Sequence, residues 1–239
     1  MIKQTRDLGL SVFQICDYPE IETLSDDELA AVRHAADTFG VQIELGTRGI
    51  QLAHLRTYLG LAGKLGATFV RSMINTANHR PSASEAIDVL RRVVPEFAAR
   101  GATIGLETYE QVRTDTLLDV IGAIDDAHLG VVLDPANCVA ALELPSDVIR
   151  KCAPYVVNLH VKDFAFVRAP GWVGFSLNGC PLGEGLLDYP AMLDQVRPDD
   201  RGINQIVEHW LPWQGNYELT SREEEQWTQH NVDIMRSTR

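Results

Sequence analysis

The stretches Leu129-Gly-Val-Val-Leu-Asp134 and Tyr155-Val-Val-Asn-Leu-His160 decide the fold of this chain. In both, the apolar residues form a nearly continuous run instead of alternating with polar ones. Continuous runs of this kind are typical of parallel strands that are covered on both faces. Each run also stops at a side chain that can bind a metal ion.

Similar runs recur along the chain, separated by longer amphipathic stretches, which is the pattern of repeated βα units. No GxGxxG or GxxxxGK[ST] motif follows any of them, and this disfavours a nucleotide-binding doubly wound sheet. We therefore expect an α/β fold, a parallel (β/α) TIM-type barrel, forming one domain over residues 1–239. The expected strands are Ser11–Cys16, Val41–Glu44, Ala67–Met73, Ala102–Glu107, Leu129–Asp134, Tyr155–His160 and Ile203–Glu208.

The count of seven strands predicts an open barrel, because a closed barrel of this class has eight βα units. The chain opens with Met1-Ile-Lys-Gln-Thr-Arg-Asp7, which is typical of the end of a helix, so the first βα unit is expected to be lacking. The strands at 11–16 and 203–208 would then flank a seam. Since unpaired strand edges promote association, we expect a homo-oligomer, with a dimer favoured.

The composition is that of an ordinary soluble globular protein, with 239 residues, 45% hydrophobic and 23% charged. The formal net charge of −12 and the lack of Lys/Arg stripes argue against nucleic acid as a partner. No apolar run is long enough to span a membrane, and no signal core opens the chain. The four cysteines lack CxxC spacing, so we expect a reduced, cytoplasmic protein.

Three Ser/Glu pairs have the spacing of a helix capping box, in which each side chain satisfies a backbone N–H group of the other residue. They are Ser25/Glu28, Ser82/Glu85 and Ser221/Glu224. Pro95 lies within a helical pattern and predicts a kink or a break there.

Four strand ends carry side chains that are able to bind a metal: Glu107, Asp134, His160 and Glu208. In a parallel barrel these ends lie on one C-terminal rim, where barrel enzymes build their sites. Three carboxylates brought together there would repel one another unless a cation lies between them. Carboxylate and imidazole ligands suit Mn²⁺, Mg²⁺, Co²⁺ or Zn²⁺, and the lack of thiolate favours Mn²⁺.

Five segments resemble the sugar phosphate isomerase/epimerase superfamily, the xylose-isomerase-like TIM barrels, and the resemblance runs over nearly the whole chain. They are Leu106-Glu-Thr-Tyr-Glu110, Leu133-Asp-Pro-Ala-Asn137, His160-Val-Lys-Asp163, Pro181-Leu-Gly-Glu-Gly185 and Ile206-Val-Glu-His-Trp210. The resemblance implies one divalent metal ion on Glu107, Asp134, His160 and Glu208, and a small polyhydroxylated carbonyl compound as substrate. In ketose 3-epimerases of the superfamily, the two glutamates also exchange protons with the substrate. Glu107 and Glu208 are therefore expected to be catalytic, with ligation alone as the alternative.

The main expectation is a metal-dependent isomerase or epimerase that acts on a keto-sugar through an enediolate, since a metal eases loss of a hydrogen beside a carbonyl. Asn137 stands where those epimerases carry a histidine that contacts the substrate, which counts against 3-epimerisation. One alternative is a lyase (decarboxylase, dehydratase or deglycosidase) that acts on a 3-keto-sugar compound. The other is a catalytically inactive binding or complex subunit.

Further side chains are expected to bind the substrate: Asn137, Lys162, Arg71, Arg48, Glu44 and Trp210. Lys162 follows His160 by two residues, so both point to the same face, where the ammonium could neutralise an oxyanion. Arg71 and Arg48 suit a substrate carboxylate or phosphate. Glu44 ends its strand, with pairing to an arginine as the alternative.

Loops beyond the strand ends complete the expected site. Trp210, like Trp172 and Trp213, follows a strand at the rim and could cover a sugar. Asp163 points away from the centre and is expected to hold a neighbouring loop. The glycine-rich segment Phe164–Asp188 is expected to be a mobile cover over the barrel mouth.

Overall fold

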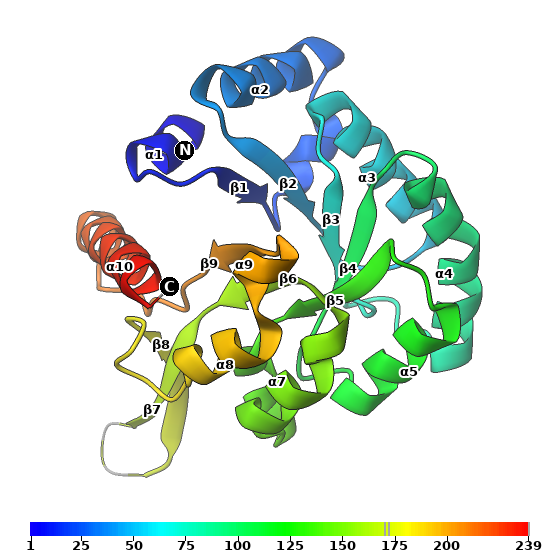
Figure 1. Ribbon diagram of the computed structural model, residues 1–239. Coiled ribbons are helices and arrows are strands. Elements are labelled where there is room, and N and C mark those ends of the chain that lie inside the picture. Colours follow the sequence, from blue (N-terminus) through cyan, green and yellow to red (C-terminus); the bar gives the residue numbers. More distant parts are fainter. Residues whose placement is uncertain (170, 172, 239) are drawn as a thin grey trace.

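The computed structural model describes residues 1–169, 171 and 173–238, which form a TIM-type barrel with its helices outside the strands (Figure 1). Seven strands of the described residues pair in the order β1-β2-β3-β4-β5-β6-β9, and every neighbouring pair is parallel. The predicted fold class is thus confirmed. These strands are β1 (Val12–Ile15), β2 (Gln42–Gly46), β3 (Phe69–Ser72), β4 (Thr103–Glu107), β5 (Leu129–Leu133), β6 (Val156–Val161) and β9 (Asn204–Val207).

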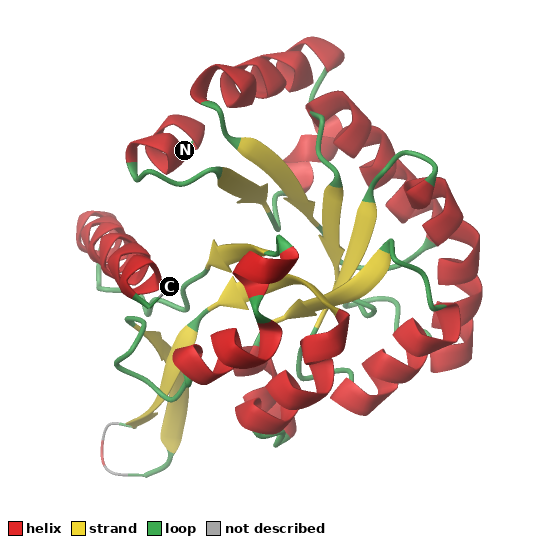
Figure 2. Cartoon of the chain, viewed as in Figure 1, coloured by secondary structure: helices red, strands yellow, loops and turns green. Residues whose placement is uncertain are grey.

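The helices cover the outer face of the barrel, as Figure 2 shows in red around the yellow strands. The α-helices are α1 (Ile2–Asp7), α2 (Asp26–Phe39), α3 (Leu52–Leu65), α4 (Ala83–Ala98), α5 (Thr114–Ile124), α6 (Pro135–Cys138), α7 (Pro145–Cys152), α8 (Tyr189–Val196), α9 (Pro198–Arg201) and α10 (Tyr217–Ser237). Short 3-10 turns lie at η1 (Pro19–Thr23), η2 (Val139–Ala141) and η3 (Ala153–Tyr155). In the described part of the chain, none of these helices has the length and hydrophobicity that crossing a bilayer requires.

The starts of α2, α4 and α10 follow from local capping chemistry. Ser25 and Ser82 form the predicted capping boxes with Glu28 and Glu85 at the starts of α2 and α4. The box predicted at Ser221 is wrong, because α10 begins one turn earlier, after Asn216, whose side chain accepts the N–H of Leu219 at 2.9 Å.

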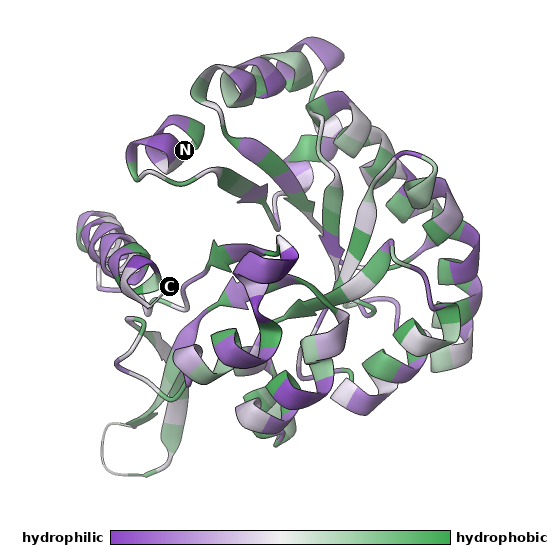
Figure 3. Cartoon of the chain, in the orientation of Figure 1, coloured by the Kyte–Doolittle hydropathy of each residue, from purple (hydrophilic) through white to green (hydrophobic). Residues whose placement is uncertain are grey.

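Of the kink or break predicted at Pro95, the break is wrong, since α4 continues through it to Ala98. The face of α4 that meets the barrel carries fully buried residues, among them Leu90, Val93 and Phe97. Burial of such side chains stabilises the helix more than the loss of one backbone hydrogen bond weakens it. Figure 3 shows the same partition, with mostly green or pale strands inside helices that are partly purple.

The predicted seam is narrow: no strand ladder joins β1 to β9 among the described residues, yet the two strands lie against each other and nearly close the barrel. The chain itself covers this seam. In Figure 1 the C-terminal helix α10 lies beside α1, and the Arg236 guanidinium donates to the carbonyl of Leu8. Val232 and Met235 of α10 are buried. The open seam therefore gives less reason to expect a second chain than the sequence suggested.

The described residues after β6 form an antiparallel hairpin within the segment predicted to cover the barrel mouth, and the mobility of that segment stays a prediction. Strands β7 (Asp163–Arg168) and β8 (Phe175–Cys180) pair antiparallel, from Asp163↔Cys180 to Arg168↔Phe175. This hairpin projects from the barrel in Figure 1. The sequence Phe164-Ala-Phe-Val-Arg168 is rich in residues that favour strands, but the many glycines of the whole segment suggested a loop instead. Trp172 lies outside the described residues.

Candidate metal centre

Four side chains converge at the C-terminal mouth of the barrel: Glu107 at the end of β4, Asp134 directly after β5, His160 on β6, and Glu208 directly after β9. One ligand atom from each lies within 4.8 Å of all the others. Glu107, Asp134 and His160 are buried, and Glu208 is partly exposed. The expectation that the four share one rim is confirmed.

The strand ends hold these carboxylates in place through local hydrogen bonds. Thr108 Oγ1 donates to the Asp134 carbonyl at 2.9 Å and accepts the Asp134 N–H at 2.9 Å. Asp134 also caps the short helix α6, because its Oδ1 accepts the N–H of Asn137 at 3.3 Å. Pro135 occupies the first helical position, where its fixed backbone is suited to a helix start.

Two buried cations balance part of the negative charge. Lys162 Nζ lies 2.8 Å from Asp134 Oδ2 and 2.8 Å from Glu208 Oε1, and it stacks over the Trp210 ring at 4.3 Å from the centroid. The Arg71 guanidinium donates to Glu107 Oε2 and, at 3.0 Å, to the carbonyl of Thr47. Lys162 therefore lies on the inner face of the barrel mouth, as predicted, whereas Arg71 forms an ion pair with Glu107.

Burial and charge shift the ionisation of the cluster. Burial raises the pKa of Asp134, and the nearby charges of Glu107 and Glu208 add to the rise. Burial would lower the pKa of His160, but the carboxylates of Glu107 and Glu208 outweigh it and raise that pKa above its ordinary value. For Glu208 the effect of burial is outweighed by the hydrogen bond from His160 and the charge of Lys162, which hold its pKa far below the usual range.

The residues present fit a divalent cation. Asp134 Oδ2 is buried and accepts no hydrogen bond from the described residues, although the Lys162 ammonium lies 2.8 Å away. A carboxylate oxygen has two lone pairs, so Oδ2 can bind a cation in addition to this contact. Together with His160 Nδ1, which faces Glu208 Oε2 at 2.9 Å, it offers a site of oxygen and nitrogen ligands that suits such ions.

Asn137 links the two sides of the cluster. Its Nδ2 donates to Glu107 Oε1 at 2.7 Å, and its Oδ1 accepts from Lys162 Nζ at 3.3 Å. The amide thus holds the Glu107 carboxylate from the side opposite Arg71. Asn137 lies at the expected place, beside the candidate ligands.

The remaining predicted residues lie apart from the cluster. Arg48 is exposed and forms two hydrogen bonds with Asp17, at 3.0 and 2.5 Å, beside a pocket of about 390 Å³ that Thr47, His54 and Tyr58 also line. Glu44 is not at a strand end, because β2 continues to Gly46. Its carboxylate lies inside the barrel and accepts from three amide groups, so the expected alternative of an arginine partner is wrong as well.

Those amide groups belong to Gln14, Asn158 and Asn204. The two asparagines were not singled out from the sequence. A signal was present, since an asparagine inside an otherwise apolar strand must find a hydrogen-bond partner. Asn158 precedes His160 by two residues, which places both on the same face of β6.

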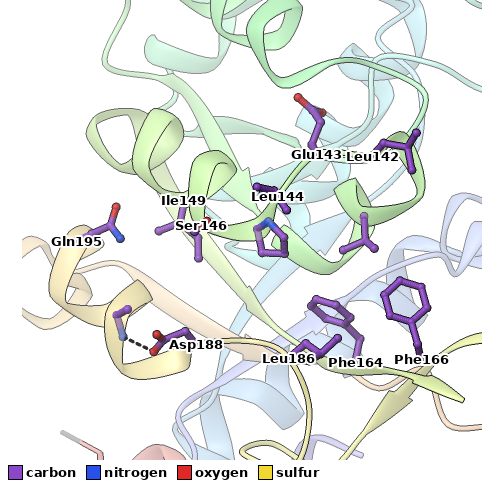
Figure 4. Close-up of a pocket in the computed structure, with 13 residues that line it drawn as sticks. Leu142, Glu143, Leu144, Ser146, Ile149, Phe164, Phe166, Leu186, Asp188 and Gln195 are labelled. Carbon is purple, nitrogen blue, oxygen red and sulfur yellow. Dashed lines mark hydrogen bonds between the residues drawn. The ribbon is translucent and has the colours of Figure 1, made fainter.

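A separate apolar groove of about 500 Å³ lies between α7, α8 and the β7–β8 hairpin (Figure 4). Leu144, Phe166 and Leu186 line it, and each has an exposed side chain. None of the four candidate ligands lines this groove. It is thus distinct from the metal centre.

Comparisons with known proteins agree with this architecture. The chain is 53% identical over 235 residues to a 3-oxo-isoapionate decarboxylase of Pectobacterium atrosepticum, covering 98% of this chain and 86% of that protein. A xylose isomerase domain protein from Planctomyces limnophilus has a similar structure, with a TM-score of 0.79, 19% identity, and coverage of 100% and 92% of the two chains. A D-psicose 3-epimerase from Clostridium cellulolyticum H10 also reaches 0.79, at 13% identity and with 99% and 92% covered. Residues 2–238 match a family profile, and the chain belongs to the xylose isomerase-like TIM barrel family.

Proposed function

We propose that this protein is a divalent-metal-dependent lyase that removes CO₂ from a 3-oxo sugar acid. The observation that carries the proposal is the 53% identity, over 98% of the chain, to a 3-oxo-isoapionate decarboxylase. The likeness to a 3-epimerase, at 13% identity, supports a shared fold alone. The lyase is therefore favoured over the isomerase or epimerase that the motifs first suggested.

The chemistry of a 3-oxo acid suits the site. The bond between the carboxylate carbon and its neighbour breaks, its electron pair moves toward the ketone oxygen, and CO₂ leaves. The enediolate that remains takes up a proton at carbon to give the product ketone. A divalent ion on Glu107, Asp134, His160 and Glu208 would act as a Lewis acid toward that oxygen, and Mn²⁺ is the ion we favour.

The side chains around the cluster have roles in this proposal. The Lys162 ammonium, fixed by Asp134 and Glu208, would stabilise negative charge that develops on the substrate oxygen. Asn137 would hold Glu107 in place. The pocket beside Arg48, with its polar residues Thr47 and His54, would receive the hydroxylated end of the substrate.

Glu107 and Glu208 would have different proton-transfer tasks in the two reactions. In an epimerase, Glu107 and Glu208 would each exchange a proton with the substrate, whereas a decarboxylase needs one proton delivered after CO₂ has left. Glu107→Gln and Glu208→Gln are each expected to abolish turnover even where metal is retained. A near-normal turnover rate in either variant would show that the substituted residue takes no part in the reaction.

Reaction in D₂O tests the proposal. For a decarboxylase, the product gains one deuterium at carbon, and the unreacted substrate gains none. Exchange of deuterium into the substrate without loss of CO₂ would instead indicate an isomerase or epimerase.

A homodimer remains part of the proposal, although the seam no longer supplies its reason. The exposed apolar side chains of Leu142, Leu144 and Phe166 around the groove in Figure 4 are the surface that now supports it. Size measurement in solution decides the matter. A single species near 26.5 kDa at micromolar concentration would contradict the dimer.

A further inference from the structure

A layer of four polar side chains lies inside the barrel, one step below the metal cluster. It consists of Gln14 on β1, Glu44 on β2, Asn158 on β6 and Asn204 on β9. Gln14 pairs in register with Glu44, and Asn158 with Asn204. Branched apolar residues ordinarily fill the interior of such barrels, and buried polar groups are costly unless they are hydrogen-bonded. The side chains of this layer must therefore form hydrogen bonds with one another or with their neighbours.

The Glu44 carboxylate is the centre of this layer and is 1% exposed. Its Oε2 accepts from Gln14 Nε2 at 3.0 Å and from Asn158 Nδ2 at 2.9 Å. Its Oε1 accepts from Asn204 Nδ2 at 2.6 Å. Each of the three amides donates an N–H to this carboxylate, so their NH₂ groups point toward it. For Gln14, this directs the side-chain carbonyl away from Glu44.

That carbonyl meets the candidate metal ligand. Gln14 Oε1 lies 3.0 Å from His160 Nε2. The other ring nitrogen, Nδ1, faces the cluster, 2.9 Å from Glu208 Oε2 and 3.9 Å from Glu107 Oε2. The imidazole is thus held between an acceptor on one side and the metal position on the other.

We infer that Gln14, oriented by Glu44, is a positioning residue that keeps the proton of His160 on Nε2 and leaves Nδ1 free for the metal. A neutral imidazole has one donor and one acceptor nitrogen, and an amide carbonyl can only accept. A metal-binding histidine commonly donates its second nitrogen to such an acceptor, which fixes the ring and strengthens the ligand. The inference rests on the metal site of the proposed function and is independent of the reaction.

The opposite arrangement is disfavoured by the same contacts. If the Gln14 amide were turned over, its carbonyl would face the Glu44 carboxylate, and two acceptors would oppose each other in a buried space. Its NH₂ group would then face His160 Nε2 and would place the ring proton on Nδ1, where the metal must bind. Glu44 prevents this although it never touches the cluster.

Two substitutions at position 14 and one control separate positioning from general stability. Gln14→Leu removes the acceptor. Gln14→Glu combined with Glu44→Gln exchanges the amide and the carboxylate, so position 14 still accepts from His160 and residue 44 donates to it. Asn204→Leu removes one partner of Glu44 and leaves the Gln14 contact in place. The readouts are the dissociation constant for Zn²⁺ and the ring-nitrogen NMR spectrum of Zn²⁺-loaded protein labelled with ¹⁵N-histidine.

In the unsubstituted protein we expect His160 to bind Zn²⁺ through Nδ1 and to carry a hydrogen-bonded proton on Nε2. Gln14→Leu should weaken Zn²⁺ binding about 10- to 100-fold and lose the hydrogen-bonded shift of that proton. The double variant Gln14→Glu/Glu44→Gln should retain both. Asn204→Leu should lower stability and leave both unchanged.

The inference is overturned if Gln14→Leu keeps the parental affinity and spectrum, if Asn204→Leu loses as much affinity, or if Zn²⁺ binds through Nε2. An unsubstituted protein that binds no Zn²⁺ would remove both this inference and the metal site. Zn²⁺ binding that responds to Gln14 in a protein that releases no CO₂ would leave the inference standing and remove the proposed reaction.

Discussion

Lys162 Nζ and Asp134 Oδ2 form an ion pair at 2.8 Å, in which neither side chain is more than 1% exposed. Removing one partner of a buried pair leaves the other charge unpaired, which costs about 3–5 kcal/mol. We expect Lys162→Met to lower the stability of the metal-free protein by this amount, as measured by urea unfolding. Saturating Mn²⁺ should restore part of the loss, because the ion would pair with Asp134. Equal stability of the variant and the parent without metal would refute this role.

Asn137 should affect turnover more than binding, since it holds Glu107 through a hydrogen bond of 2.7 Å. A hydrogen bond to a charged group contributes about 1.5–3 kcal/mol, which corresponds to a loss of about 10- to 100-fold in kcat if it acts in the transition state. Asn137→Ala should show this loss in steady-state kinetics. Asn137→Asp, which places a second carboxylate against Glu107, should lose more. An unchanged kcat in Asn137→Ala would exclude a positioning role for the amide.

Asp163 holds the base of the hairpin and the turn that follows it. Its two oxygens accept the N–H groups of Phe164, Gly183, Gly185 and Leu187 at 2.8–2.9 Å. Each buried N–H left without a partner costs about 1–3 kcal/mol. Asp163→Ala should therefore expose residues 181–187 to amide hydrogen exchange and destabilise the protein more than Asp163→Asn. Protection equal to that of the parent would contradict this account.

The pH dependence of the metal-free protein follows from His160, whose pKa is raised by neighbouring carboxylates that outweigh its burial. A group whose pKa is higher in the folded than in the unfolded protein contributes its full stabilisation below the unfolded pKa, which is about 6.5 for histidine. This contribution is lost as the pH rises through the folded pKa. Thermal unfolding in EDTA should therefore show falling stability from about pH 6.5 upward. Mn²⁺ affinity should rise over the same interval, because the metal replaces the proton. Metal-free stability that increased with pH there would contradict the assignment.

The strands and the cluster could be predicted from the sequence because both follow from local pattern and topology. The run Gly130-Val-Val-Leu133 marks a strand covered on both faces, and parallel pairing then brings every strand end to one rim. This was enough to bring Glu107 and His160 together without knowledge of any contact. The alternation of side chains between the two faces of a strand also predicted correctly that Asp163 holds a neighbouring loop.

The interior contacts could not be predicted, because they depend on which strands face each other across the barrel. Glu44 and Asn204 are 160 positions apart in sequence, and no local pattern pairs them. Arg71 was expected to face an anion of the substrate, but the neighbouring strand β4 presents Glu107 to it. An extension of β2 by two residues moved Glu44 from the rim to the interior.

The central claim is decarboxylation at the metal centre. It is tested most directly by CO₂ release from 3-oxo-isoapionate, the compound that appears in the name of the relative that is 53% identical. We predict one CO₂ for each substrate molecule consumed by Mn²⁺-loaded protein. We predict none after removal of metal with EDTA, and none with the Glu107→Gln variant. Consumption of the substrate by the loaded protein without CO₂, or release at the same rate in EDTA, would contradict the account.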